Sequence, residues 1–316
     1  MKEINMKIAM IIPAYNEELA IEQTLNQFKV HAPELELWVI DNNSSDRTQE
    51  IAKQFFKNNP AITGGVIFEP RQGKAFAMRT AFHQIQADFY GMIDADATYP
   101  VHEIHQLIHF AVHEKYDMVI GDRHSKGDYK KVMNRPFHNF GNKLVSNLIN
   151  RLFRAEINDI MSGYRILSRK FAKGYPILCA GFEIETEMTI HALDKRFKIK
   201  EVPISFTDRP EGSFSKLNTY RDGYRIIKTI FWVFKDFHPL RFFGYFAILF
   251  ALSGILAGLP VVIEFLQTHF ITHVPLAILA TGFMIFALIL TAVGLILDTV
   301  AKNQKFNYEL QLLRDK

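Results

Sequence analysis

The sequence predicts an α/β protein with a mostly parallel sheet, followed by a hairpin of two transmembrane helices. Through the first two thirds of the chain, short apolar runs alternate with stretches of helical periodicity. This alternation is typical of strands whose two faces are covered by helices. Two long runs without any charged residue then follow, at residues 242–263 and 274–297.

The expected strands are short, apolar and rich in β-branched residues. They cover residues 7–12, 35–40, 66–68, 89–93, 117–120 and 198–203. Apolar residues at helical spacing predict the helices between them, which cover residues 18–28, 47–56, 74–85, 102–113 and 183–192. A less regular region, residues 123–181, is expected to mix helices with loops.

In parallel sheets, ligands bind outside the carboxyl ends of the strands. Polar clusters stand at three of the predicted strand ends, at residues 14–18, 41–46 and 94–98. These three segments are therefore the first candidates for a functional site.

Charge and cysteine content exclude some classes of protein. The 37 basic and 33 acidic residues interleave along the predicted soluble part, so nucleic acid is not an expected partner. The chain has one cysteine, Cys179, which excludes an intrachain disulfide and favours a reducing compartment. The apolar run at residues 8–12 is too short for a signal peptide.

Both long apolar runs are long enough to cross a bilayer, which takes about 20 residues. Basic residues flank the pair, whereas the connection at 264–273 has no Lys or Arg. The positive-inside rule then predicts a multi-pass protein of the cytoplasmic membrane with both termini in the cytoplasm. The alternative is a buried helical hairpin of a soluble protein. Such a hairpin also has faces on which a second copy could pack, which leaves a homo-oligomer open.

The segment before the first span, residues 220–237, carries aromatic residues at helical spacing with Arg and Lys between them. It predicts an amphipathic helix in the headgroup layer, with an ordinary core helix as the alternative. The predicted organisation is therefore an α/β domain at 1–210, a basic juxtamembrane segment at 211–241 and a membrane region at 242–316.

Asp94 and Asp96 follow a predicted buried strand two residues apart. Two carboxylates so placed can share one Mg²⁺ or Mn²⁺ with the phosphates of a ligand. An Asp-x-Asp pair is common in loops by chance, and its position at a strand end is what strengthens the prediction.

Asp41 ends another predicted strand, where its carboxylate is placed to accept hydrogen bonds from a nucleobase. Tyr15 and Glu17 offer a stacking face and a carboxylate for base and ribose. The simpler interpretation of both segments is a strand-to-helix turn, and for Ser45 and Asp46 we expect only helix capping.

Nucleotide motifs of other enzyme classes are absent. Gln72-Gly73-Lys74 is not a phosphate-binding P-loop, because Phe68 stands in place of its first glycine and Ala75 in place of Ser/Thr. The glycine-rich dinucleotide fingerprint is also missing after the first strand. The sequence thus argues against a kinase, an ATPase or a dehydrogenase.

Five ordered motifs resemble family 2 glycosyltransferases of the GT-A fold. They are Ile12-Pro13-Ala14-Tyr15-Asn16-Glu17, Asp41-Asn42-Asn43-Ser44-Ser45-Asp46, Arg71-Gln72-Gly73-Lys74, Asp94-Ala95-Asp96 and Ser162-Gly163-Tyr164-Arg165. A later segment, residues 209–216, is similar to the polyprenyl-phosphate branch of that family, which includes dolichol-phosphate mannosyltransferases. That branch often has Gln where Thr98 stands, so a third protein ligand for the metal is not evident.

The resemblance implies inverting transfer of a sugar from a UDP- or GDP-sugar to a polyprenyl phosphate. It places Pro13 and Lys74 with Tyr15, Glu17, Asp41 and Asp94 around the nucleotide, and Asp159 as base or phosphate-orienting group. It also implies a set of residues that grip phosphate or acceptor, namely Arg123, Arg135, Arg165, Arg209, Ser215 and Lys216. Arginine suits this role because it binds phosphate in bidentate fashion.

Three rival functions are weighed against this one. A processive polysaccharide synthase usually carries Gln-x-x-Arg-Trp and more spans, and neither Trp38 nor Trp232 has that context. A membrane adaptor that only binds the nucleotide-sugar would not need the intact acidic and basic motifs. A transporter is disfavoured because two spans do not enclose a pathway.

Overall fold

The computed structural model describes residues 6–127, 136–177, 179, 181, 183–210, 228 and 231–314. The chain divides into two compact units, Met1–Gly223 and Tyr224–Lys316. Each is described by itself. The predicted boundaries at residues 210 and 241 stay predictions.

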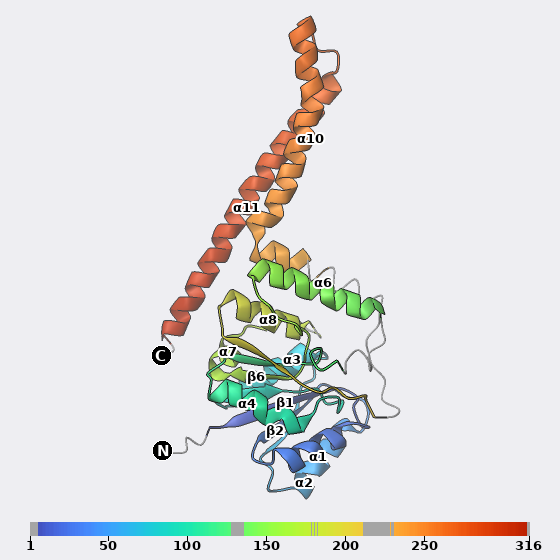
Figure 1. Ribbon diagram of the computed structural model, residues 1–316, viewed down its shortest axis with the longest axis vertical. Helices are drawn as coiled ribbons and strands as arrows, with labels where there is room; N and C mark the ends of the chain where they lie inside the picture. Colours follow the sequence, from blue (N-terminus) through green and yellow to red (C-terminus); the bar gives the residue numbers. More distant parts are fainter. Residues whose placement is uncertain are drawn as a thin grey trace. The chain divides into compact units, whose positions relative to one another are not determined.

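The first unit is built on a seven-stranded sheet in the order β3-β2-β1-β4-β6-β5-β7 (Figure 1). The strands are β1 (Ile8–Ala14), β2 (Glu36–Asp41), β3 (Gly64–Phe68), β4 (Phe89–Met92), β5 (Met118–Asp122), β6 (Arg165–Ser168) and β7 (Ile199–Pro203). β6 runs antiparallel to β4 and β5, and the other pairs are parallel. The predicted mostly parallel sheet is confirmed.

Helices connect and cover these strands. They are α1 (Ile21–His31), α2 (Thr48–Asn58), α3 (Lys74–Gln84), η1 (Val101–Glu103), α4 (Ile104–Val112), α6 (Pro136–Phe153), α7 (Arg169–Gly174) and α8 (Ile184–Asp194). The region predicted to be irregular contains α6, β6 and α7. Its strand β6 is short and contains a fully buried arginine, Arg165, so its sequence does not show the apolar run of a core strand.

α1 begins three residues later than expected because side chains of the neighbouring turn bind the amides that precede it. The amides of Asn16, Glu17 and Glu18 donate to Ser44 Oγ, Thr48 Oγ1 and an Asp46 carboxylate oxygen at 3.0, 2.8 and 3.2 Å. Polar side chains that take backbone donors in this way compete with helix formation.

The core lies between the sheet and its helices. Met10 pairs with Leu37 and Ile12 with Val39 across β1 and β2, and all four are at most 1% exposed. On the other side of β1, Met10 pairs with Gly91, where a Cβ would come within 2.0 Å of the Met10 sulfur. This packing holds the central strands, and therefore their carboxyl ends, in fixed register.

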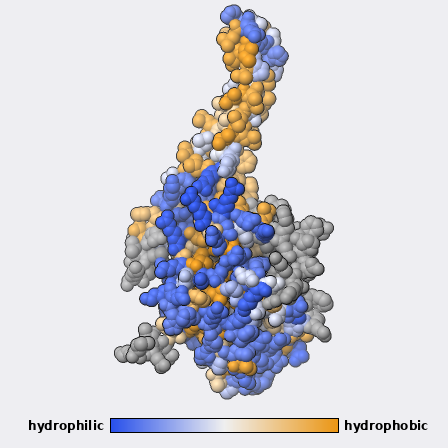
Figure 2. All heavy atoms as spheres, in the orientation of Figure 1, coloured by the Kyte–Doolittle hydropathy of each residue, from blue (hydrophilic) through white to orange (hydrophobic). Residues whose placement is uncertain are grey.

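The second unit contains the two predicted apolar helices, α10 (Pro239–Thr268) and α11 (Val274–Arg314). Both are long and apolar enough to cross a membrane, and only 17% and 11% of their most apolar windows are buried. Their surface is largely hydrophobic in Figure 2. Helices of a soluble core would bury this surface, so it argues against the soluble hairpin.

Candidate active site

The carboxyl ends of β1 and β2 lie side by side, since Ala14 pairs with Asp41 at the last position of both strands. The turns that follow are tied together: Asn16 Oδ1 accepts from the amide of Ser45 at 2.8 Å. Asp46 accepts from the amide of Thr48, the first residue of α2, at 3.0 Å. The N-cap position itself is occupied by Arg47, whose side chain makes no capping hydrogen bond.

Asp41 is 1% exposed at the tip of β2. Its Oδ2 accepts from the Gln49 side-chain amide at 3.4 Å, whereas its Oδ1 is buried without a hydrogen-bond partner. A buried carboxylate oxygen without a donor is costly. A ligand whose N–H reaches this oxygen would remove that cost, which agrees with the nucleobase contact predicted for Asp41.

Asn42 fixes the loop that precedes α3. Its side chain donates to the carbonyl of Arg71 and accepts from the amide of Gly73, both at 2.6 Å. Gly73 has a φ of 140°, a conformation that residues with side chains rarely adopt. The motif Arg71-Gln72-Gly73-Lys74 thus shapes a turn that starts α3 with Lys74.

Lys74 does not lie open to a nucleotide. Its ammonium contacts carboxylate oxygens of Asp94 and Glu185, and its side chain is 7% exposed. Burial lowers its pKa, but the two carboxylates outweigh this effect and hold the pKa above its ordinary value. Lys74 therefore stays charged and is paired with Asp94 and Glu185, which is a correction to the predicted direct nucleotide contact.

Glu185 lies in the first turn of α8. It is 4% exposed and its carboxylate is paired with Lys74. Burial raises the pKa of Glu185, and the Lys74 ammonium opposes the rise.

Asp96 lies at the bottom of the same site, 7% exposed. Its Oδ1 accepts from Thr98 Oγ1 at 2.7 Å, and its Oδ2 lies 2.5 Å from Arg209 Nη2. Burial first, and then the neighbouring Asp94 carboxylate, raise the pKa of Asp96. Two neighbouring carboxylates repel one another when both are ionised, and a cation between or beside them offsets this repulsion.

The carboxylates fit the predicted divalent metal. Positive charge already lies against both, Lys74 on Asp94 and Arg209 on Asp96. Among the described residues no group of three or more His, Cys, Asp or Glu is arranged as a metal site. Asp94 and Asp96 are therefore the two carboxylates that would hold a Mg²⁺ or Mn²⁺ together with oxygens of a ligand. Thr98, at the position in doubt, binds Asp96.

Arg209 joins two of the predicted segments. Besides Asp96, it lies 3.7 Å from a carboxylate oxygen of Glu17, and its side chain is 27% exposed. It thus brings the residues after β7 to the turn after β1, as expected if both face one ligand. Tyr15 and Pro13 are half-buried at the same strand end.

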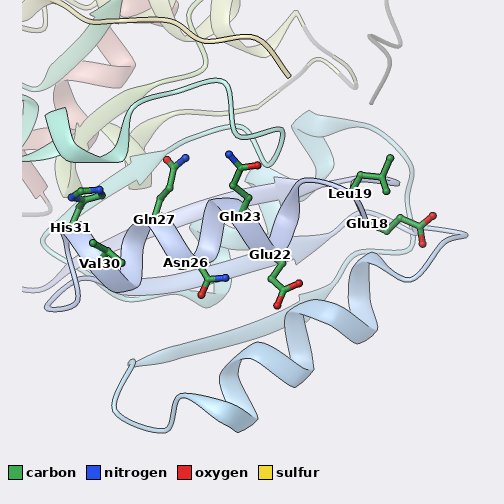
Figure 3. A pocket seen from close by; sticks show the side chains of 8 residues that line it. All are labelled: Glu18, Leu19, Glu22, Gln23, Asn26, Gln27, Val30 and His31. Carbon is green, nitrogen blue, oxygen red and sulfur yellow. The ribbon is translucent and has the colours of Figure 1, made fainter. Parts of the chain in front are cut away.

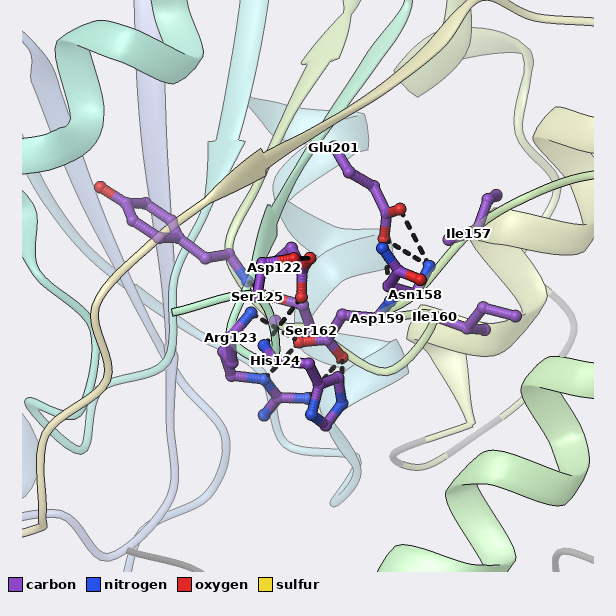
Figure 4. Close-up of polar contacts among 12 residues, drawn as sticks. Asp122, Arg123, His124, Ser125, Ile157, Asn158, Asp159, Ile160, Ser162 and Glu201 are labelled. Carbon is purple, nitrogen blue, oxygen red and sulfur yellow. Dashed lines mark hydrogen bonds and ion pairs between the residues drawn. The ribbon is translucent and has the colours of Figure 1, made fainter. Parts of the chain in front are cut away.

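Arg123 and Asp159 form a second centre, in which the two side chains point toward one another (Figure 4). Arg123 Nε and Nη2 donate to the two carboxylate oxygens of Asp159 at 2.7 and 2.8 Å, and the Arg123 amide donates at 3.1 Å. Burial favours a raised pKa for Asp159, but Arg123 outweighs it and holds the pKa below its ordinary value.

A carboxylate so held is a poor base. Of the two roles left open by the sequence, the geometry favours the orienting role for Asp159: it fixes the Arg123 guanidinium. Glu201 supports this arrangement from β7, because its carboxylate accepts from the amides of Asn158 and Asp159 at 2.9 and 2.8 Å (Figure 4).

Tyr99 connects this centre to the acidic pair. The Arg123 guanidinium lies 5.9 Å from the Tyr99 ring centroid, and the Tyr99 hydroxyl accepts from the Gly163 amide at 2.9 Å. Gly163 in turn packs on Asp94, since a Cβ at this position would come within 2.6 Å of a carboxylate oxygen. Nothing in the sequence distinguishes Tyr99 as a site residue, although Gly163 stands in a matched motif.

Arg165 is a correction. It is fully buried, and its guanidinium donates to the carbonyls of Ile160 and Ser162 at 2.5 and 2.9 Å and to Thr189 Oγ1 at 2.9 Å. It therefore cannot contact an acceptor directly and instead shapes the turn that carries Gly163. The other predicted acceptor residues, Arg135, Ser215 and Lys216, lie outside the described residues.

A shallow groove elsewhere on the domain runs along α1, with lining residues between Glu18 and His31 (Figure 3). The acidic pair, Asp41 and Arg123 do not line it. The candidate active site is therefore the strand-end cluster and not this groove.

Comparisons with known proteins identify the family of this chain. The family model "Glycosyl transferase family 2" matches residues 9–175. Glycosyltransferase AglJ of Haloferax volcanii is 27% identical over 294 residues, which is 93% of this chain and 93% of that relative. The dolichol-phosphate mannosyltransferase of Pyrococcus furiosus is 31% identical over 237 residues, 71% of this chain and 64% of that relative.

Among solved structures, glucosyl-3-phosphoglycerate synthase from Mycobacterium tuberculosis, in complex with Mn²⁺, UDP-glucose and phosphoglyceric acid, matches with a TM-score of 0.55. The match covers 72% of this chain and 79% of that one at 20% sequence identity. At this identity the likeness concerns the fold, and it confirms the predicted GT-A architecture.

Proposed function

This chain belongs to glycosyl transferase family 2 and is a glycosyltransferase, and we propose that it transfers a sugar from a UDP- or GDP-sugar to a polyprenyl phosphate at the cytoplasmic face of a membrane. The observation that carries the proposal is the pairing of opposite charges at the strand ends, in a chain that also has two unburied apolar helices. Asp94 and Asp96 supply the negative side, and Arg123 and Arg209 the positive side.

On the donor side, Asp41 accepts from the base, and Tyr15 and Glu17 lie beside base and ribose. Asp94 and Asp96 would hold a Mg²⁺ or Mn²⁺ ion, which would neutralise charge on the departing diphosphate. A metal and a UDP-sugar are both present in the structurally similar synthase, which supports this arrangement.

On the acceptor side, Arg123 and Arg209 attract a phosphate monoester and offset its repulsion from the donor. One acceptor oxygen forms a bond to the anomeric carbon while the bond to the diphosphate oxygen breaks, with inversion. The bonding electrons leave with the nucleoside diphosphate. The acceptor is largely a dianion near neutral pH, because its second pKa is about 6, so no side chain has to remove a proton.

The proposed reaction thus requires cationic side chains more than a general base. This agrees with Asp159, whose two carboxylate oxygens are both hydrogen-bonded to Arg123. Arg135, Ser215 and Lys216 complete the proposed acceptor site from segments outside the described residues. The basic segment 220–237 is proposed to lie in the headgroup layer, where a lipid phosphate resides.

The experiment is a transfer assay with the purified full chain. The protein is incubated with Mg²⁺ or Mn²⁺, labelled UDP-glucose, UDP-N-acetylglucosamine or GDP-mannose, and undecaprenyl or dolichyl phosphate. Label in the organic phase after extraction is the expected result and identifies donor and acceptor together. Asp96→Asn should abolish the signal, since it removes one of two metal-binding carboxylates.

Label that never becomes lipid-extractable with folded protein, under any donor and acceptor pair, would contradict the proposal. Retained binding of nucleotide-sugar in that case would indicate the adaptor. Label in a growing polysaccharide would indicate the synthase.

A further inference from the structure

Lys74 forms a buried bridge between a carboxylate of the active site and one behind it. Its ammonium contacts Oδ1 of Asp94 and Oε1 of Glu185. The side chains of Lys74 and Glu185 are 7% and 6% exposed, whereas that of Asp94 is 30% exposed. Asp94 is thus the member of this triad that a ligand can reach.

The position of Glu185 is fixed by the same residues that confine Asp94. Thr189 Oγ1 donates to the carbonyl of Glu185 at 2.9 Å and lies 2.9 Å from Arg165 Nη1. Arg165 also binds the Ser162 carbonyl, next to Gly163, whose backbone packs on Asp94. Lys74 on one side and Gly163 on the other therefore leave the Asp94 carboxylate little room to rotate.

The charges in this triad decide how much negative charge Asp94 presents. Lys74 carries one positive charge and divides it between two carboxylates, so the triad has a net charge of −1. If Glu185 were neutral, the ammonium would act on Asp94 alone and the pair would have no net charge. Attraction to a divalent cation would then weaken, although the geometry of Asp94 would be kept.

We propose that Glu185 is a positioning residue which, through Lys74, sets both the orientation of Asp94 and the charge that Asp94 offers to a divalent cation. The inference rests on the proposed function only in taking Asp94 as a metal ligand. It does not depend on which sugar or acceptor is used. It also explains why the buried Glu185 lies behind Lys74, whereas the lysine of a phosphate-binding P-loop would contact the nucleotide.

The test measures Mn²⁺ affinity without acceptor. Mn²⁺ is titrated into the full chain with saturating UDP, and separately GDP, and unbound Mn²⁺ is followed by electron paramagnetic resonance. Glu185→Gln keeps the shape and an acceptor for Lys74 but removes the charge. It should weaken Mn²⁺ binding about 10–100-fold, because the Lys74 ammonium then acts on Asp94 alone.

Two further variants separate this role from a structural one. Glu187→Gln removes the same charge from the same helix, where the carboxylate accepts from the Cys179 amide, and should leave Mn²⁺ affinity unchanged. Lys74→Met with Glu185→Leu removes both buried charges together. Asp94 then keeps its full charge, so Mn²⁺ binding should be at least as tight as in the wild type, while kcat falls because the carboxylate is no longer held.

Wild-type Mn²⁺ affinity in Glu185→Gln overturns the inference, as does an equal loss in Glu187→Gln. If Glu185→Gln does not fold, weakened Mn²⁺ binding in the double variant overturns it. Failure of the proposed function is a different result: Mn²⁺ affinity that responds to Glu185 as expected, in a protein that transfers no sugar to any polyprenyl phosphate.

Discussion

At the scale of single residues, the strand-end carboxylates divide into two kinds by what already binds them. Asp41 has a buried oxygen without a hydrogen-bond partner, which is an open place for a ligand. Asp159 has both carboxylate oxygens hydrogen-bonded to Arg123, so its hydrogen-bond partners are supplied within the protein. In the proposed site, aspartate would thus recognise a ligand at one position and orient a cationic side chain at the other.

The Arg123–Asp159 pair gives a prediction that separates binding of phosphate from base catalysis. Arg123→Lys keeps the charge but loses the bidentate contact. It should lower kcat/KM for the acceptor by about 10–100-fold, since a hydrogen bond to a charged group contributes about 1.5–3 kcal/mol, and leave KM for the nucleotide-sugar nearly unchanged. Steady-state kinetics with each substrate varied in turn measure this.

Asp159→Asn serves as the comparison, because it loosens the same guanidinium without touching its charge. It should also lower kcat/KM for the acceptor, but by a smaller factor than Arg123→Lys. The pH dependence of kcat/KM should be unchanged above the pH range in which carboxyl groups ordinarily titrate. The folded pKa of Asp159 is lowered, so the stability it provides is present above the unfolded pKa and is lost only as pH falls through the folded value. Loss of the acidic limb in the Asp159→Asn pH profile would instead identify Asp159 as the base, because a base must be deprotonated to act.

Much of this site was predictable from sequence, because residues at the carboxyl end of a strand are close in sequence to the strand that positions them. Asp41, Asp94 and Asp96 are of this kind. Partners from distant segments were not predictable: Glu185 reaches Lys74 across 111 residues. Arg165 could not be told from a phosphate ligand, since its burial depends on the packing of α8 against its strand.

At the scale of elements, α8 is held by an aromatic cluster that contains a histidine. The His191 ring lies 5.6 Å from the Phe171 ring, 5.1 Å from Tyr175 and 6.0 Å from Phe197, centroid to centroid. Burial lowers the pKa of His191 from 6.5 to about 4. The folded protein therefore keeps this ring neutral where the unfolded chain protonates it.

This difference predicts that acid destabilises the catalytic unit earlier than its carboxylates alone would. His191 should cost stability progressively as pH falls from about 6.5 to about 4, because the unfolded state binds the proton more tightly in that window. His191→Phe keeps an aromatic ring in the cluster and should flatten the fall in melting temperature over this range. Parallel pH dependences for wild type and variant would contradict the prediction.

The helical hairpin owes its close packing to small residues. In α10, a Cβ on Gly254 would come within 3.0 Å of the Met284 side chain and 3.2 Å of the Ala280 carbonyl in α11, and Gly258 also faces Ala280. Small residues let transmembrane helices approach closely. The Gly-x-x-x-Gly spacing is thus used within the chain, which the sequence alone could not distinguish from a contact between copies.

Gly254→Leu should force α10 and α11 apart and destabilise the hairpin by about 1–3 kcal/mol, as overpacking usually does. Protease sensitivity of the detergent-solubilised protein measures the effect, with cleavage between the two helices expected to quicken. Gly282→Leu is the matched control, because nothing lies within 4 Å of a Cβ at that position. Equal sensitivity of the two variants would count against helix packing at Gly254.

At the scale of the whole molecule, the proposed reaction requires a water-soluble donor and a lipid acceptor to meet. In this proposal the strand-end site of the sheet binds the donor, and the two apolar helices attach the chain to the membrane. The length and composition of α10 and α11 were predictable because roughly 20 uncharged residues in sequence leave few alternatives. The orientation of the two helices across the membrane is inferred from the charged residues that flank them, and it depends on the membrane as well as on the chain.

Orientation can be tested with the chain's own cysteine content. Cys179 lies in the catalytic unit, where burial raises the pKa of its thiol, so it should react slowly with maleimides. In a Cys179→Ala background, a cysteine is introduced at Ile271 between the two helices or at Gln304 near the end of α11. With an impermeant maleimide on intact cells, Ile271→Cys should be labelled, and Gln304→Cys only after permeabilisation. Labelling of Gln304→Cys from outside would place the basic flank on the outer side of the membrane, and with it the active site that precedes the first span. Nucleotide-sugars are absent from that side, so this result would exclude the proposed cytoplasmic reaction.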